Sequence, residues 1–193
     1  MHLRSVFRSP SVGRFGAMLG TVALASAVMM MWGGVHAAPA VPDPASVMTD
    51  PAQARVDYIE NCAGCHGVTG DTVPAHLPEL AGRIGWFMCT PEARAYLLRL
   101  PNVAHSRITD NAELADLMNY VVFVLGKGTA PAGTPPFTAA EVTRNRKLAL
   151  TNANLTAERL RLANQLVSQC HAPASMRELY VTTAPRVWPS DKQ

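Results

Sequence analysis

Five consecutive residues constrain the fold of this chain more than any others. Cys62 and Cys65 are separated by two small residues, Ala63 and Gly64, and His66 follows directly. Two thiols at this spacing can each add to a vinyl group at the edge of a porphyrin, and the adjacent imidazole then lies beneath the iron. The motif therefore predicts one covalent haem c, with His66 as the proximal iron ligand.

Cysteine pairs of this spacing have two other common uses. A thioredoxin-like redox pair follows a strand in a βαβ unit, and a structural zinc site needs a second pair of ligands. The sequence around the motif has neither feature. Cys170-His171 resembles the end of a second haem motif, but Val167 stands where its first cysteine would be. We therefore expect a single haem.

The amino-terminal segment has the order of a secretory signal peptide. An uncharged apolar run over 15–32 follows three arginines and precedes small residues, which predicts a signal peptide over 1–37 with cleavage after Ala37. The run is also long enough for an uncleaved membrane anchor. We expect a periplasmic protein that contacts the membrane only if this segment is retained.

The same segment accounts for the basic character of the chain. It holds three of the 17 lysines and arginines and no acidic residue, so the remaining chain has as many basic residues as its 14 acidic ones. This balance gives no reason to expect nucleic-acid binding. The expected partners are redox proteins in the periplasm, one as electron donor and one as acceptor.

Helix-capping patterns predict an all-α fold. Asp50, Thr90, Asp110 and Thr138 each stand where a short polar side chain can cap a helix, and no run of strand-like alternation occurs. The predicted helices are 51–61, 91–100, 110–126, 138–150 and 156–170.

Composition divides the chain into four parts. A signal peptide over 1–37 precedes a mobile, proline-containing leader over 38–49. A helical haem domain follows over 50–126. Residues 127–193 then form a linker rich in glycine and proline and a helical extension.

Positions around the motif resemble the class I cytochrome c family. Tyr58 stands four residues before the first cysteine, where that family has an aromatic residue, and Pro78 stands where its proline carbonyl accepts the ring N–H of His66. Leu117 and Tyr120 resemble the leucine and tyrosine of the family's last core helix. The resemblance spans the first three predicted helices, and it implies a cytochrome c-like domain around one haem.

The distal iron ligand is where the sequence departs from that family. The resemblance implies a methionine in the loop before the last core helix, but residues 101–109 contain none. The loop contains His105, which we predict as the distal ligand. Met88 is the alternative, and an open distal face is a third. Met118 lies within the last core helix, where we expect core packing.

Several residues outside the motif also carry predictions. Cys89 and Cys170 are an even pair in an oxidising compartment, and we predict a disulfide between them, although nothing in the sequence fixes their distance. Trp86, Arg83 and Arg94 are candidate partners of the haem propionates.

These features predict an electron carrier in the periplasm and not an enzyme. One alternative is a small haem enzyme of the peroxidase type, which needs a vacant iron position and an acid–base residue beside it. The other is a cytochrome subunit of a periplasmic quinoprotein dehydrogenase.

Overall fold

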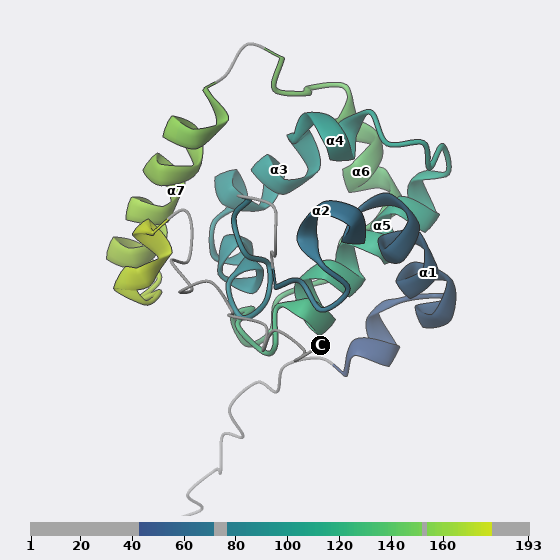
Figure 1. Ribbon diagram of the computed structural model, residues 1–193, viewed down its shortest axis with the longest axis horizontal. Helices are drawn as coiled ribbons and strands as arrows, with labels where there is room; N and C mark the ends of the chain where they lie inside the picture. The colour runs from purple at the N-terminus through teal and green to yellow at the C-terminus, as the bar shows by residue number, and fades with distance from the viewer. Residues whose placement is uncertain (1–42, 72–76, 152–153, 179–193) are drawn as a thin grey trace, which may run out of the picture. The chain divides into compact units, whose positions relative to one another are not determined.

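The computed structural model describes residues 43–71, 77–151 and 154–178, and every regular element in these ranges is helical (Figure 1). This confirms the predicted all-α fold. The predicted signal peptide lies outside the described residues. Among the helices that are described, none combines the length and the apolar character needed to cross a bilayer.

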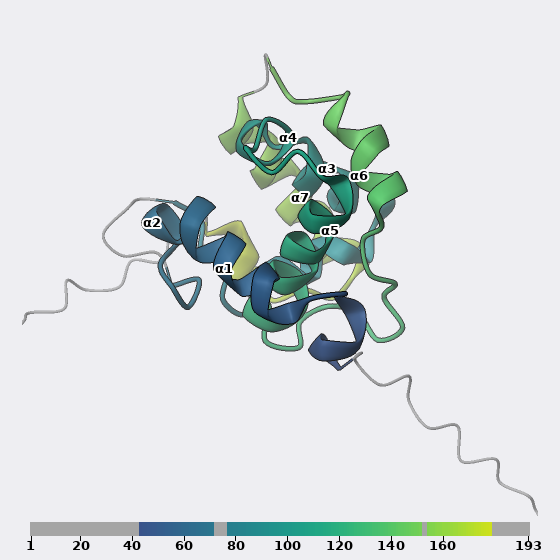
Figure 2. The ribbon, with the colours of Figure 1, turned by 90° about the vertical axis from the view of Figure 1, so that its right-hand side faces the viewer.

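The described elements are α-helices, 3-10 helices and one π-helix. The α-helices are α1 (Pro51–Asn61), α2 (Ala63–His66), α3 (Pro91–Arg99), α4 (Pro101–Ala104), α5 (Asn111–Asn119), α6 (Ala139–Arg146) and α7 (Leu155–Gln169). The 3-10 turns are η1 (Pro44–Val47), η2 (Ile84–Cys89) and η4 (Ala174–Arg177), and η3 (Tyr120–Leu125) is a π-helix that continues α5. Figure 2 shows α5 between α1 and α6.

The predicted helix starts are confirmed by their caps. Asp50 accepts a hydrogen bond from the Gln53 backbone N–H at 2.9 Å, and the side chains of Thr90, Asp110 and Thr138 accept from the backbone in the same way. Each cap satisfies an N–H that has no partner within the first helical turn. Local side-chain chemistry therefore decides where these helices begin.

The helix ends differ from the prediction at two places. Pro101 starts α4 after α3 has ended at Arg99. Proline suits the first position of a helix, because the N–H that it lacks would have no partner there. The helix that begins after Thr138 ends at Arg146, four residues earlier than predicted.

Part of the predicted mobile leader belongs to the core. Val47 and Met48 are buried, and the backbone N–H of Thr49 donates to Asp116 on α5 at 2.8 Å. The amide of the buried Asn119 donates to the carbonyl of Val47 at 3.0 Å. The leader prediction is therefore wrong for residues 43–49, since they form the turn η1 and are bound to α5 through Val47 and Thr49.

Asn119 joins three segments of the core. Its side chain is 1% exposed, donates to the carbonyls of Val47 and Phe137, and accepts from the N–H of Phe137 at 2.7 Å. Replacement by leucine leaves these buried backbone groups without partners, so we expect Asn119→Leu to lower the free energy of unfolding by about 2 kcal/mol. Urea denaturation of the purified protein measures this loss. The exposed Asn164 is the matched control, and its replacement by leucine should change stability by less than about 0.5 kcal/mol.

The residues after Gly126 are part of the same core, and Arg94 is one of their anchors. Its guanidinium binds both carboxylate oxygens of Glu141 at 2.6 and 2.7 Å, donates to the carbonyls of Pro135 and Pro136, and stacks 4.3 Å from the centre of the Phe137 ring. These contacts occupy a side chain that is only 13% exposed. Arg94 therefore has a structural role in place of the predicted role at a haem propionate.

We expect Arg94→Met to destabilise the protein by about 2 kcal/mol, because Glu141 and two carbonyls then lose a charged donor in a partly buried site. Arg161 is the control, since its pair with Glu92 is 47% and 55% exposed. Arg161→Met should cost less than about 1 kcal/mol in the same denaturation experiment. Equal losses in the two variants would contradict the anchoring role.

The predicted disulfide between Cys89 and Cys170 is confirmed. It joins the end of η2 to the end of α7, with 6.3 Å between the two Cα atoms. Helix α7 packs through Leu162, Ala163 and Leu166, which are all buried. Leu160 lies outside this buried face and is 38% exposed.

Candidate functional site

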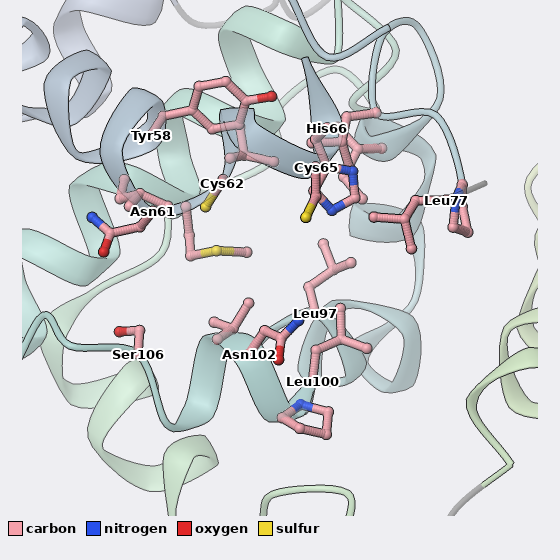
Figure 3. Close-up of a pocket in the computed structure, with 18 of the residues that line it drawn as sticks. Tyr58, Asn61, Cys62, Cys65, His66, Leu77, Leu97, Leu100, Asn102 and Ser106 are labelled. Atoms are coloured by element: carbon pink, nitrogen blue, oxygen red, sulfur yellow. The ribbon is translucent and has the colours of Figure 1, made fainter. Parts of the chain in front are cut away.

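The haem motif opens onto a cavity of about 380 Å³ (Figure 3). This volume lies in the range typical of cofactor and ligand sites. Most of its lining side chains are apolar and come from three parts of the fold. One wall is formed by Tyr58, Asn61, Cys62, Cys65, His66, Leu77, Pro78, Leu80 and Ile84; the second by Tyr96, Leu97, Leu100, Pro101, Asn102, Val103, Ser106, Leu114, Leu117, Met118 and Val121; the third by Leu155, Thr156 and Arg159.

The motif is held in a single helical turn. Cys62 caps the carboxyl end of α1, with its N–H bonded to the Tyr58 carbonyl at 2.9 Å, and its own carbonyl accepts from the His66 N–H at 3.0 Å. This turn brings both cysteine side chains and the imidazole to one cavity (Figure 3). Both thiols are free, and Cys65 is exposed. Burial, and then the neighbouring Cys65, raise the pKa of Cys62 to about 11, so this thiol is protonated at neutral pH.

A hydrogen bond from Tyr58 fixes the turn that follows His66. The Tyr58 hydroxyl donates to the carbonyl of Gly67 at 2.6 Å, and the Tyr58 side chain is fully buried. Gly67 has a φ of 73°, and a Cβ there would contact the backbone of Asp71. Only glycine fits this turn without strain. Tyr58 therefore acts on the motif through the backbone.

His66 has the properties of a neutral imidazole ligand. Burial lowers the pKa of His66, the positive charge of Arg159 lowers it further, and the backbone carbonyl of Pro78 opposes both. Its Nδ1 is buried and has no hydrogen-bond partner within the described part of the chain. An uncharged ring with one nitrogen beside a backbone carbonyl can offer the other nitrogen to a metal.

The remaining residues of the family resemblance lie at or beside this cavity. Pro78 and Leu117 line it. Tyr120 packs against Tyr58, with 5.6 Å between the ring centres. Tyr120 therefore supports the site through Tyr58.

Neither predicted distal ligand reaches the cavity. His105 is exposed at the carboxyl end of α4 and does not line it, because the turn that Pro101 starts presents Asn102 and Val103 instead. Met88 is buried elsewhere, with its sulfur 3.8 Å from a nitrogen of Arg94. Our choice of distal ligands is therefore not supported by the structure.

The predicted propionate partners also lie away from the cavity lining. Arg83 donates to the carbonyls of Ser175 and Glu178, both at 2.9 Å, and Trp86 packs against the core. The charged side chain that does line the cavity is Arg159, which sequence reasoning missed. The period of the apolar residues in α7 gave one signal, since Arg159 precedes Leu162, Ala163 and Leu166 on the same helical face.

The residues of the cavity fit a covalent haem. Two free thiols, a neutral imidazole and an apolar lining are the groups that such a cofactor needs. A zinc site has less support, because no cluster of three or more histidine, cysteine or acidic side chains occurs among the described residues.

Comparison with known proteins supports a c-type cytochrome. The chain is 27% identical over 118 residues to cytochrome c-552 of Thermus thermophilus, in a match that covers 52% of this chain and 90% of that protein. A second cytochrome c-552, from a named strain of the same species, is also 27% identical over 118 residues, and 80% of it is covered. No family model and no solved structure matches the chain.

Proposed function

We propose that this chain is a periplasmic electron-transfer cytochrome that carries one haem on Cys62, Cys65 and His66. The observation that supports it most is the convergence of two free thiols and one neutral imidazole on a single apolar cavity. The haem supplies one-electron chemistry, with its iron cycling between two oxidation states. The similarity to cytochrome c-552 points to the same function.

Each part of the site has a physical task in this proposal. His66 provides the iron-facing nitrogen, and the Pro78 carbonyl beside the ring favours the tautomer that leaves this nitrogen free. The bond from Tyr58 to Gly67 holds the motif in place. The apolar walls exclude water, which lowers the cost of rearranging solvent when one electron enters or leaves.

The cavity favours a carrier over a haem enzyme. Figure 3 shows Leu97, Leu100 and Asn102 across the open space from His66. No aspartate or glutamate is among the described residues that line the cavity. A peroxidase-type reaction needs a proton-transferring group beside the reacting atoms. A carrier needs no such group, so a cavity lined mainly by apolar side chains is compatible with electron transfer.

The mass and the spectra of the purified protein test this function. We expect the mass of one haem per chain after acid–acetone treatment, and reversible one-electron reduction in a potentiometric titration. The Cys62→Ala single variant is the matched control and should retain a single thioether at Cys65. Freely extractable haem, or two haems per chain, would reject the proposal.

The exposed position of His105 leads to a spectroscopic prediction. We expect His105→Ala to leave the ferric absorption and near-infrared spectra unchanged, because the side chain does not line the cavity. Met118→Leu is the comparison variant, because Met118 does line the cavity and is the one methionine among the described residues that do so. A change to a high-spin spectrum on replacing His105 would show that the imidazole does reach the iron.

A further inference from the structure

We propose that Arg146 of α6 is a positioning residue for the haem site, which holds the loop over 104–108 so that His105 stays in solvent. Without this arginine, the loop can turn and His105 can bind the haem iron. The inference rests on the proposed function. It gives the extension after Gly126 a task at the redox centre, where the family resemblance assigns none.

The loop over 104–108 joins α4 to α5 and borders the cavity. Val103 and Ser106 line the cavity, whereas His105, which lies between them in the sequence, is exposed. Figure 3 shows Ser106 across the open space from Cys62 and Cys65. The backbone has two soft dihedral angles per residue, so a local rotation near residue 105 changes which side chain faces the cavity. The exposure of His105 therefore depends on what holds the backbone of this loop.

Arg146 binds the loop backbone at three places. Its Nε donates to the carbonyl of Ala104 at 2.9 Å, and its two terminal nitrogens donate to the carbonyls of Ile108 at 2.9 Å and Ser106 at 3.2 Å. A fourth bond of 2.9 Å joins it to the side-chain oxygen of Asn111, in the first turn of α5. The guanidinium has five N–H donors in a fixed plane, so it can serve all four acceptors at once. One side chain thus fixes the whole loop.

The core, and not the loop, determines where Arg146 lies. Val142, one helical turn earlier in α6, is fully buried. Asn145 is 8% exposed and accepts from Nε of Arg99 on α3 at 2.9 Å. Thr143 accepts from the side-chain amide of Asn111 at 2.8 Å. Because α6 is bound to α3 and α5 in this way, Arg146 is a fixed support for the loop.

Turning His105 towards the cavity requires the neighbouring carbonyls of Ala104 and Ser106 to leave the guanidinium. A hydrogen bond to a charged donor disfavours a conformer that lacks it by about ten-fold or more. Two such bonds together disfavour the turned loop by about a hundred-fold. Removal of the guanidinium removes this preference. The freed imidazole is then a strong ligand for haem iron.

The experiment records the ferric absorption and electron paramagnetic resonance spectra of holoprotein carrying Arg146→Gln, with and without His105→Ala. We expect Arg146→Gln to raise the ratio of low-spin haem with two imidazoles to all other ferric forms at least about ten-fold. The added His105→Ala should restore the spectra of the unaltered protein. Arg144→Gln is the matched control, because Arg144 is exposed on the same helix, and it should leave the spectra unchanged.

Unchanged spectra in Arg146→Gln would overturn the inference, and so would the same spectral change with and without His105. If Arg146→Gln does not fold, Arg146→Lys gives a second test, because lysine keeps the charge and the aliphatic stem but cannot serve four acceptors at once. It should shift the spectra in the same direction, and spectra identical to those of the unaltered protein would reject this role of Arg146. Absence of covalent haem in the unaltered protein would instead reject the proposed function.

Discussion

Replacing both Cys62 and Cys65 by alanine is expected to abolish covalent haem attachment completely. Each thiol supplies one thioether bond, and the two thiols line the same cavity as His66. No other free cysteine occurs among the described residues, because Cys89 and Cys170 are bonded to each other. The double variant therefore has no alternative attachment point within the described fold.

Haem-stained denaturing gels and intact-protein mass measure this loss. The double variant should show no haem-stained band, whereas Cys89→Ser with Cys170→Ser should keep full staining, because that pair does not take part in attachment. Covalent haem retained after both motif cysteines are removed would contradict the assignment of this site.

Short-range patterns predicted the parts of the molecule that short-range physics decides. The motif at Cys62 to His66 and the caps at Asp50 and Thr90 involve residues within a few positions of each other. The side chains of Asp50 and Thr90 form the cap bonds in the structure that their spacing indicates. Tyr58 was also placed at the site from sequence, although its bond to Gly67 was not foreseen.

Long-range packing decides the parts that were missed. His105 was selected because it is in the loop before α5, but the orientation of a loop side chain depends on the turn that Pro101 starts. The cavity wall formed by Arg159 requires α7 to fold back over η2, and the disulfide that joins them spans 81 positions of sequence. Local periodicity places Arg159 on the buried face of α7, but it does not say what that face packs against. Residues 43–49 were misread for the same reason, since their partner Asp116 is 67 positions from Thr49.

Removing the disulfide that holds α7 in place should affect the protein more than any other change except the loss of the motif cysteines. Cys89 and Cys170 are 81 positions apart, so their bond restricts a long loop in the unfolded chain. The loop-closure entropy for this length corresponds to about 4.5 kcal/mol, in a model where the bond acts on the unfolded state. We expect Cys89→Ser with Cys170→Ser to lower the free energy of unfolding by about 2 to 4 kcal/mol. Denaturant titration of the holoprotein measures it.

The position of the bond adds a functional consequence to this loss of stability. Helix α7 keeps Leu162 and Leu166 against the core without the disulfide, but its far end then loses the covalent link to η2 and keeps its contacts with η4. Transient release of α7 would expose the cavity wall that contains Arg159. The serine double variant should therefore show faster reaction of the reduced haem with small external oxidants than the unaltered protein. Reduction of the unaltered protein with dithiothreitol, followed by alkylation of the two thiols, should reproduce the same change. Identical reaction rates in all three forms, together with an unchanged denaturation midpoint, would show that packing alone holds α7 on the haem site.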